Sequence, residues 1–410
     1  MKTVPAAVML IKNRLFTPGP TPLLPQAQQA MAAFSLHHRT SEFRELYSHV
    51  LADLKRFIGT RNDCLLLAAS GTGAMEAAVA NLTSPGERVL VLSAGKFGER
   101  WAELCRAYQC RAEVFAAPYG ETFAPEKLRA ALTPELACIY VQATESSTGV
   151  RHNVQAVASF ARELAPTALV IMDAITGLGT TRFDVDGWGI DVIIGGSQKA
   201  VMIPPGLAYL AVSERAWQRM EGANSPRFYF DLRRERRAAA KGESAFTPAT
   251  SLIAALAAAL EYIRELGGGN LAAGRDALIA NAETAAAITR AAARTMGLKL
   301  FAATAPAAAL TAISSPAGID SGAIIKELRS RFGAVAANGQ GEMKGKLFRI
   351  AHLGYYDYMD TIALIAALEH ALAAVWPARP FALGDGLSAA QEAYARLTAA
   401  PEPAGAPAAR

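Results

Sequence analysis

The sequence of 410 residues has no long apolar run. The longest uninterrupted one, residues 252–260, has nine residues, whereas a helix that crosses a membrane needs about 20. The N-terminal sequence MKTVPAAVMLIKNR is interrupted by Lys12 and Arg14 and has no cleavage site. We interpret it as an N-terminal arm and not as a signal peptide. The sequence therefore predicts no membrane partner.

Cysteine is scarce, with Cys64, Cys105, Cys110 and Cys138 as its only representatives. They form no CxxC pair, and no histidine stands near them at zinc-ligand spacing, so no metal site is predicted. Cys64 and Cys138 have apolar neighbours and are expected to be core thiols. So few cysteines fit a reducing, cytoplasmic location without a disulfide framework.

An excess of one charge is also missing. Lys plus Arg number 41 and Asp plus Glu number 36, which gives a net charge of +5. The densest basic segment, residues 233–237, contains Glu235 and is typical of a solvated helix face. No nucleic-acid partner is predicted. Apolar residues make up 52% of the chain, which is enough to bury a large core.

Short apolar runs that do not alternate with polar residues recur along the first half of the chain. They are residues 64–70, 88–93, 112–116, 138–143, 168–174, 191–197 and 206–213. Helical patterns separate most of these runs. Such an arrangement predicts an α/β fold with a mainly parallel, seven-stranded sheet between layers of helices.

A composition change near residue 267 predicts two domains. An Ala-rich helix over 251–266 ends at three consecutive glycines, which stop a helix. We expect an N-terminal arm (1–16), a large domain (17–268), a smaller α+β domain (269–378) and a C-terminal extension (379–410). The end of the extension, AAPEPAGAPAAR, has the composition of a disordered tail.

The segment Ser70-Gly71-Thr72-Gly73 follows the first run and opens a helix. Free N–H groups at a helix start, together with hydroxyls, can hold a phosphate, although an ordinary strand-to-helix turn has the same pattern. The segment is not GxGxxG and lacks the GK[ST] of a P-loop. This argues against a nucleotide-binding oxidoreductase.

Three charged residues occupy unusual places. Asp173 ends an apolar strand, where a carboxylate needs a facing cation or serves as a helix cap. Lys199, in GGSQKAVMIPPG, follows another apolar strand, and burial would lower its pKa and make its amine a nucleophile. The alternative is a lysine whose amine extends to the solvent. Arg349, in KLFRIAHLG, would clamp a carboxylate or form a structural ion pair. Together with the phosphate segment, these residues match the needs of pyridoxal 5′-phosphate (PLP).

From residue 16 to about residue 376 the chain resembles the class V aminotransferases of fold type I. The likeness is greatest to their alanine–glyoxylate, serine–pyruvate and 2-aminoethylphosphonate group. The motifs that carry it are TPGPTPLLP, SGTGAMEAA, SAGKFGER, TESSTGV, the stretch from Asp173 to Gly206, FTPATSLI and FRIAHLG.

The resemblance implies roles for individual residues. Lys199 would bind the PLP aldehyde and then move a proton, while Asp173 would pair with the ring nitrogen. The other cofactor contacts would be Ser70, Gly71, Thr72 and Gln198 at the phosphate, Phe97 on the ring and Ser146 near its hydroxyl. Thr247 would reach the phosphate of the neighbouring subunit, which implies a homodimer. Arg349 and the backbone near Gly19 would hold the substrate carboxylate.

The predicted function is a PLP-dependent aminotransferase that works by a ping-pong mechanism. Alanine or serine would be the donor, and glyoxylate or pyruvate the acceptor. A 2-aminoethylphosphonate donor is the main alternative, but Arg349 and Arg39 are the only cations expected near the pocket. A cysteine desulfurase needs a cysteine in the C-terminal unit, whereas the last one here is Cys138. A non-catalytic partner subunit is the remaining alternative.

Overall fold

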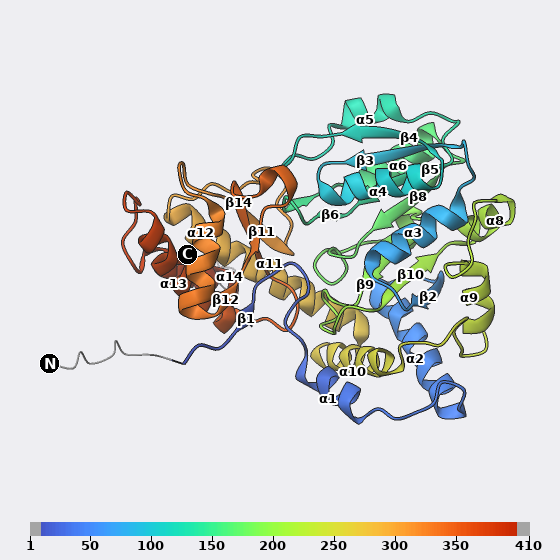
Figure 1. Cartoon of the computed structure of the whole chain (residues 1–410), viewed down its shortest axis with the longest axis horizontal. Helices are drawn as coiled ribbons and strands as arrows, with labels where there is room; N and C mark the ends of the chain where they lie inside the picture. The colour runs from blue at the N-terminus through green and yellow to red at the C-terminus, as the bar shows by residue number, and fades with distance from the viewer. Residues whose placement is uncertain (1–9, 400–410) are drawn as a thin grey trace, which may run out of the picture.

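The structure is a computed structural model that describes residues 10–399 of the chain. A large body carries the main sheet, and a smaller body, orange and red in Figure 1, lies beside it. Most of the predicted tail AAPEPAGAPAAR lies outside the described residues, as does the first part of the predicted arm.

The main sheet contains one strand from each of the seven predicted runs. These strands are β2 (Asp63–Leu67), β3 (Arg88–Ser93), β4 (Arg111–Ala116), β5 (Cys138–Gln142), β8 (Leu169–Asp173), β9 (Val192–Gly196) and β10 (Ala208–Val212). Their order across the sheet is β2-β10-β9-β8-β5-β3-β4. Only β10 is antiparallel to its neighbours, so the prediction of a mainly parallel sheet is confirmed.

Helices cover both faces of this sheet, because successive strand residues point to opposite sides. In β2, for example, Leu66 belongs to one core cluster and Leu65 to the other. The first face packs against α2 (Ser41–Ile58), α6 (Val154–Leu164) and α10 (Thr250–Leu266), and the second against α3 (Gly71–Leu82), α4 (Lys96–Ala107) and α8 (Glu214–Gly222). The remaining helices of this body are α1 (Pro25–Ala33), α5 (Pro125–Ala131), α7 (Val185–Trp188) and α9 (Leu232–Ala239).

The smaller body has its own sheet and helices. Its elements are α11 (Leu271–Thr295), β11 (Leu310–Ser314), α12 (Ser321–Phe332), β12 (Ala334–Val335), β13 (Ala337–Asn338), η1 (Gly341–Met343), β14 (Leu347–Ala351), α13 (Tyr358–Val375) and α14 (Asp385–Thr398). The antiparallel sheet runs in the order β11-β14-β13. This is the α+β unit that the sequence predicted.

Both ends of the described chain join the core of the smaller body. Strand β1 (Arg14–Leu15) pairs in parallel with β12, and Phe16 is buried in the same cluster as Ala390 and Ala393 of α14. Helix α14 packs along α11. The predicted domain boundaries remain predictions, and this core draws on residues on both sides of residue 378.

Helix α13 is the one helix among residues 10–399 that is long and apolar enough to cross a membrane. The count of uninterrupted apolar residues missed it because Glu369 and His370 divide its sequence. Its Leu364, Leu368 and Leu372 are buried in the core cluster of the smaller body, against α11, α12 and α14. This packing is typical of a core helix.

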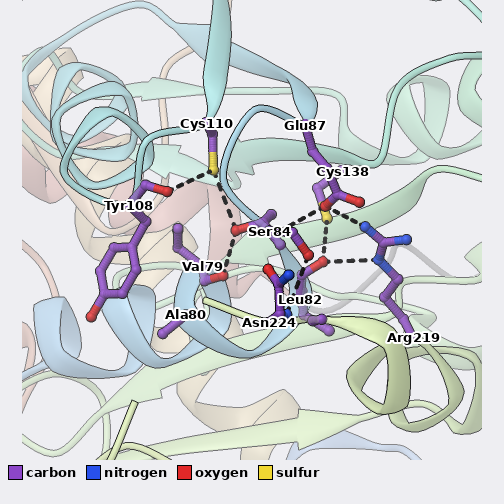
Figure 2. A network of polar contacts seen from close by, with 12 residues as sticks. Val79, Ala80, Leu82, Ser84, Glu87, Tyr108, Cys110, Cys138, Arg219 and Asn224 are labelled. Atoms are coloured by element: carbon purple, nitrogen blue, oxygen red, sulfur yellow. Dashed lines mark hydrogen bonds and ion pairs between the residues drawn. The ribbon is translucent and has the colours of Figure 1, made fainter. Parts of the chain in front are cut away.

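All four thiols are free and buried, as predicted for Cys64 and Cys138. Figure 2 shows two of them in a polar network at the carboxyl end of α3. Cys110 donates to Thr83 Oγ1 at 3.3 Å, and Cys138 donates to the Leu82 carbonyl at 3.8 Å. The same carbonyl accepts from Arg219 Nε at 3.0 Å. Burial raises the pKa of Cys138 to about 12, which keeps its thiol protonated and unreactive.

Candidate active site

Most of the predicted site residues line one cavity of about 230 Å³ at the carboxyl edge of the main sheet. They are Gly19, Ser70, Gly71, Thr72, Phe97, Ser146, Asp173, Gln198 and Lys199. Parallel strands bring their carboxyl ends to the same edge, so residues far apart in sequence meet there. Arg349 and Thr247 are not part of this lining.

Lys199 lies in the turn after β9 and is 8% exposed. Its Nζ donates to the carbonyl of Pro18. Burial lowers the pKa of Lys199 to about 8, although the carboxylate of Asp173 acts in the opposite direction. A substantial fraction of the amine is therefore neutral near pH 8 and able to attack an aldehyde.

Gly19 brings the N-terminal segment against this lysine. Its backbone φ of +148° lies in a region that residues with a side chain rarely adopt. A Cβ atom at Gly19 would stand 2.7 Å from Lys199 Nζ. A side chain at residue 19 would displace the amine of Lys199 from its present position.

Asp173 ends β8 and is 5% exposed. One carboxylate oxygen accepts from the Ile175 N–H at 2.9 Å. Burial raises the pKa of Asp173 to about 6, and the neighbouring Glu145 adds to the increase. A cation in the cavity would favour the charged form of this carboxylate, as the protonated ring nitrogen of PLP would.

The hairpin of β6 (Thr144–Glu145) and β7 (Val150–Arg151) holds a buried carboxylate behind the cavity. Glu145 Oε2 accepts from the N–H groups of Phe97 and Gly98, both at 3.1 Å. Its Oε1 accepts from the N–H and hydroxyl of Ser147. Because the Phe97 and Gly98 amides lie in the first turn of α4, Glu145 fixes the start of that helix and with it Phe97.

Arg349 lies on β14 of the smaller body, is 5% exposed and contacts the cavity residue Ser146. Its guanidinium donates to the carbonyl of Ser146 at 2.8 Å and to the carbonyl of Asn338 at 2.6 Å. Within residues 10–399 no carboxylate lies within 4.0 Å of it, so the alternative of a structural ion pair is wrong. Burial lowers its pKa to about 10, and its charge in turn lowers the pKa of Lys199.

Thr247 is exposed and lines a different hollow, beside Phe246 and Pro248. A single chain therefore does not bring it to Lys199. The role of Thr247 toward a neighbouring subunit stays a prediction.

The cavity residues that were not predicted from the sequence include Thr144 and Arg100. Both belong to quoted motifs, TESSTGV and SAGKFGER, and Arg100 follows Phe97 by one helical turn. The Thr144 hydroxyl and the Gln198 carbonyl oxygen are buried and have no hydrogen-bond partner. Unpaired polar atoms around a cavity are costly unless a polar ligand satisfies them, so the lining fits a group such as PLP. Within residues 10–399 no three His, Cys, Asp or Glu side chains are grouped to hold a metal ion.

Comparison with known proteins agrees with this arrangement. The family model aminotransferase class-V matches residues 15–312. This chain belongs to the class V aminotransferase family. The family depends on PLP, and the chain is accordingly a transaminase, which confirms the predicted enzyme class.

Three similar proteins illustrate the range of names in this family. The aminotransferase is 39% identical to the soluble hydrogenase small subunit of a Synechococcus species, over 92% of this chain and 97% of that protein. It is 31% identical to serine–glyoxylate aminotransferase of Methylorubrum extorquens, over 88% of this chain and 91% of that protein. The solved structure of a subgroup IV aspartate aminotransferase from Thermus thermophilus has a TM-score of 0.82 and 34% identity, over 88% of this chain and 100% of that one. The fold type I prediction is thereby confirmed.

Proposed function

We propose that this aminotransferase transfers an amino group from a small neutral amino acid, alanine or serine, to glyoxylate or pyruvate, with PLP held on Lys199. The observation that carries the proposal is the shared cavity of Lys199 and Asp173. Burial lowers the pKa of Lys199, which frees its amine to attack the aldehyde, and it leaves Asp173 as a buried carboxyl whose charged form a protonated ring nitrogen would stabilise. The serine–glyoxylate relative supports the choice of substrates.

The side chains of this chain divide the work. When bound, PLP supplies an electron sink for the bond broken at the substrate Cα. Lys199 Nζ would move the proton from the substrate Cα to the C4′ carbon of the cofactor. Asp173 would keep the ring nitrogen protonated, and Arg349 would bind the substrate carboxylate.

We infer a neutral donor because few cations line the cavity. Arg100 and Lys199 are the only positively charged residues among those that line it. A second carboxylate, as in aspartate, or a phosphonate would need a cation beyond the clamp at Arg349.

We further propose a cytoplasmic homodimer in which Thr247 contacts the partner's cofactor. Exposed aromatic side chains surround Thr247: Phe228 is 68% exposed and Tyr229 is 47% exposed. Tyr229 stacks on Phe246 with ring centroids 4.9 Å apart. An exposed aromatic patch of this kind is typical of a subunit interface.

A non-catalytic subunit of a larger complex is the second candidate, favoured by the name of the Synechococcus relative. The test mixes the purified PLP form with single amino acids and follows the loss of the cofactor absorbance. We expect alanine and serine to react, and aspartate and 2-aminoethylphosphonate to react at least about tenfold more slowly in kcat/KM. Faster reaction with an anionic donor would overturn the substrate proposal. No reaction with any amino acid would favour the subunit role.

A further inference from the structure

Arg100 is the cationic residue of the cavity wall that no step described above uses. It lies on α4, one turn after Phe97, and its guanidinium carbon is 4.8 Å from the centroid of the Phe97 ring. On its other side, Nη1 donates to Thr72 Oγ1 at 3.1 Å. The side chain thus bridges the aromatic residue and the hydroxyl at the start of α3.

This arginine has no acidic partner. Within residues 10–399 no carboxylate oxygen lies within 4.0 Å of its guanidinium. The adjacent Glu99 pairs instead with Lys96, at 2.6 Å, and accepts from Tyr119. A half-buried arginine without a counterion, at the wall of a cavity, is arranged to receive an anion from that cavity.

The phosphate of PLP is the anion that this position suits. The other groups expected at the phosphate, Ser70, Thr72 and Gln198, are neutral hydrogen-bonding groups. Thr72 is also the residue that Arg100 contacts. Lys199, the other cation of the lining, is needed at the aldehyde.

We propose that Arg100 is the cationic anchor of the cofactor phosphate and makes the cavity select phosphorylated over unphosphorylated pyridoxal. Phe97 and Thr72 hold the guanidinium in place. The inference rests on the proposed use of PLP and extends it, because it assigns the charge that balances the phosphate. It also leaves no free cation for a second carboxylate on the donor, in agreement with a neutral substrate.

The test compares two ligands that differ only in the phosphate group. Full-length protein freed of cofactor is titrated with PLP and with pyridoxal, and binding is followed by absorbance and by quenching of protein fluorescence. The variants are Arg100→Met, Arg100→Lys and the control Arg106→Met, which removes an exposed arginine from the same helix. Circular dichroism checks that each variant is folded.

We expect Arg100→Met to weaken PLP binding by about 30-fold and pyridoxal binding by less than about threefold, because only PLP carries the charge. Arg100→Lys should recover part of the loss, and Arg106→Met should match the wild type. Added salt should weaken PLP binding less in Arg100→Met than in the wild type.

Other outcomes would overturn the assignment in recognisable ways. Equal weakening of both ligands would mean that Arg100 only positions Phe97. Unchanged PLP binding with a raised KM for acidic donors would mean that Arg100 recognises a substrate carboxylate. Unchanged binding of both ligands with unchanged KM would remove any anion role. Failure of the wild type itself to bind PLP would instead refute the proposed function.

Discussion

Lys199 and Asp173 carry opposite charges in one buried cavity, and burial weakens the charged form of each. The pKa of the lysine falls to about 8 and that of the aspartate rises to about 6. Each charge partly offsets the effect of burial on the other. The charge states of the two groups therefore depend strongly on pH and on a bound cation.

Capture of PLP by cofactor-free protein should become faster as the pH rises through about 8 and level off above it. Only the neutral amine attacks an aldehyde, and the neutral fraction of Lys199 increases with pH. Asp173→Asn should move the midpoint below 8, since the carboxylate raises the pKa of Lys199. Stopped-flow absorbance measures the rates. A midpoint near the ordinary lysine value of 10.5 would show that the amine is solvated.

At the scale of elements, the site depends on how the β6–β7 hairpin docks against α4. Glu145 of the hairpin accepts two N–H groups from the first turn of α4, and Arg349 of β14 holds the carbonyl of Ser146. Strand, hairpin and helix are thus joined by hydrogen bonds to buried charged groups. Such bonds are strong, and their loss leaves unpaired polar groups.

Glu145→Ala should lower the free energy of unfolding by about 3 kcal/mol, because it leaves buried N–H groups of Phe97, Gly98 and Ser147 without partners. Phe97 should also lose its fixed place, so the visible absorbance band of bound PLP should shift. Urea unfolding measures the stability. The control is Glu103→Ala, which removes an exposed carboxylate from α4. Equal stability of the two variants would contradict the role of Glu145.

At the scale of the whole molecule, one chain assembles most of the site but leaves Thr247 outside it. The cavity and the exposed aromatic patch of Phe228, Tyr229 and Phe246 are separate features of the chain. In the proposed homodimer, Thr247 of a second copy would contact the cofactor in this cavity. The complete site would then belong to the dimer.

Mixed subunits test this arrangement directly. Lys199→Ala and Thr247→Glu should each be inactive alone, the second because a carboxylate repels the phosphate. After joint refolding of equal amounts, half of the dimers should be mixed, and each of these contains one intact site. Activity should therefore recover to about a quarter of the wild-type value. No recovery, or an active monomer in sedimentation, would show that Thr247 does not act across an interface.

The pattern of apolar runs along the chain predicts the α/β fold and the sheet edge at which the chemistry lies. Apolar runs mark the strands. The carboxyl ends of parallel strands lie at the same edge of the sheet, and this does not depend on the conformation of the loops between them. This placed Lys199 and Asp173 together.

The contacts between elements are visible only in the folded chain. Arg100 meets Thr72, Glu145 meets the start of α4, and Arg349 meets the carbonyl of Ser146 because separate helices and strands dock at particular angles. Periodicity shows which face of an element is buried but not which residue of another element it meets. The exposure of Thr247 was hidden in the sequence for the same reason.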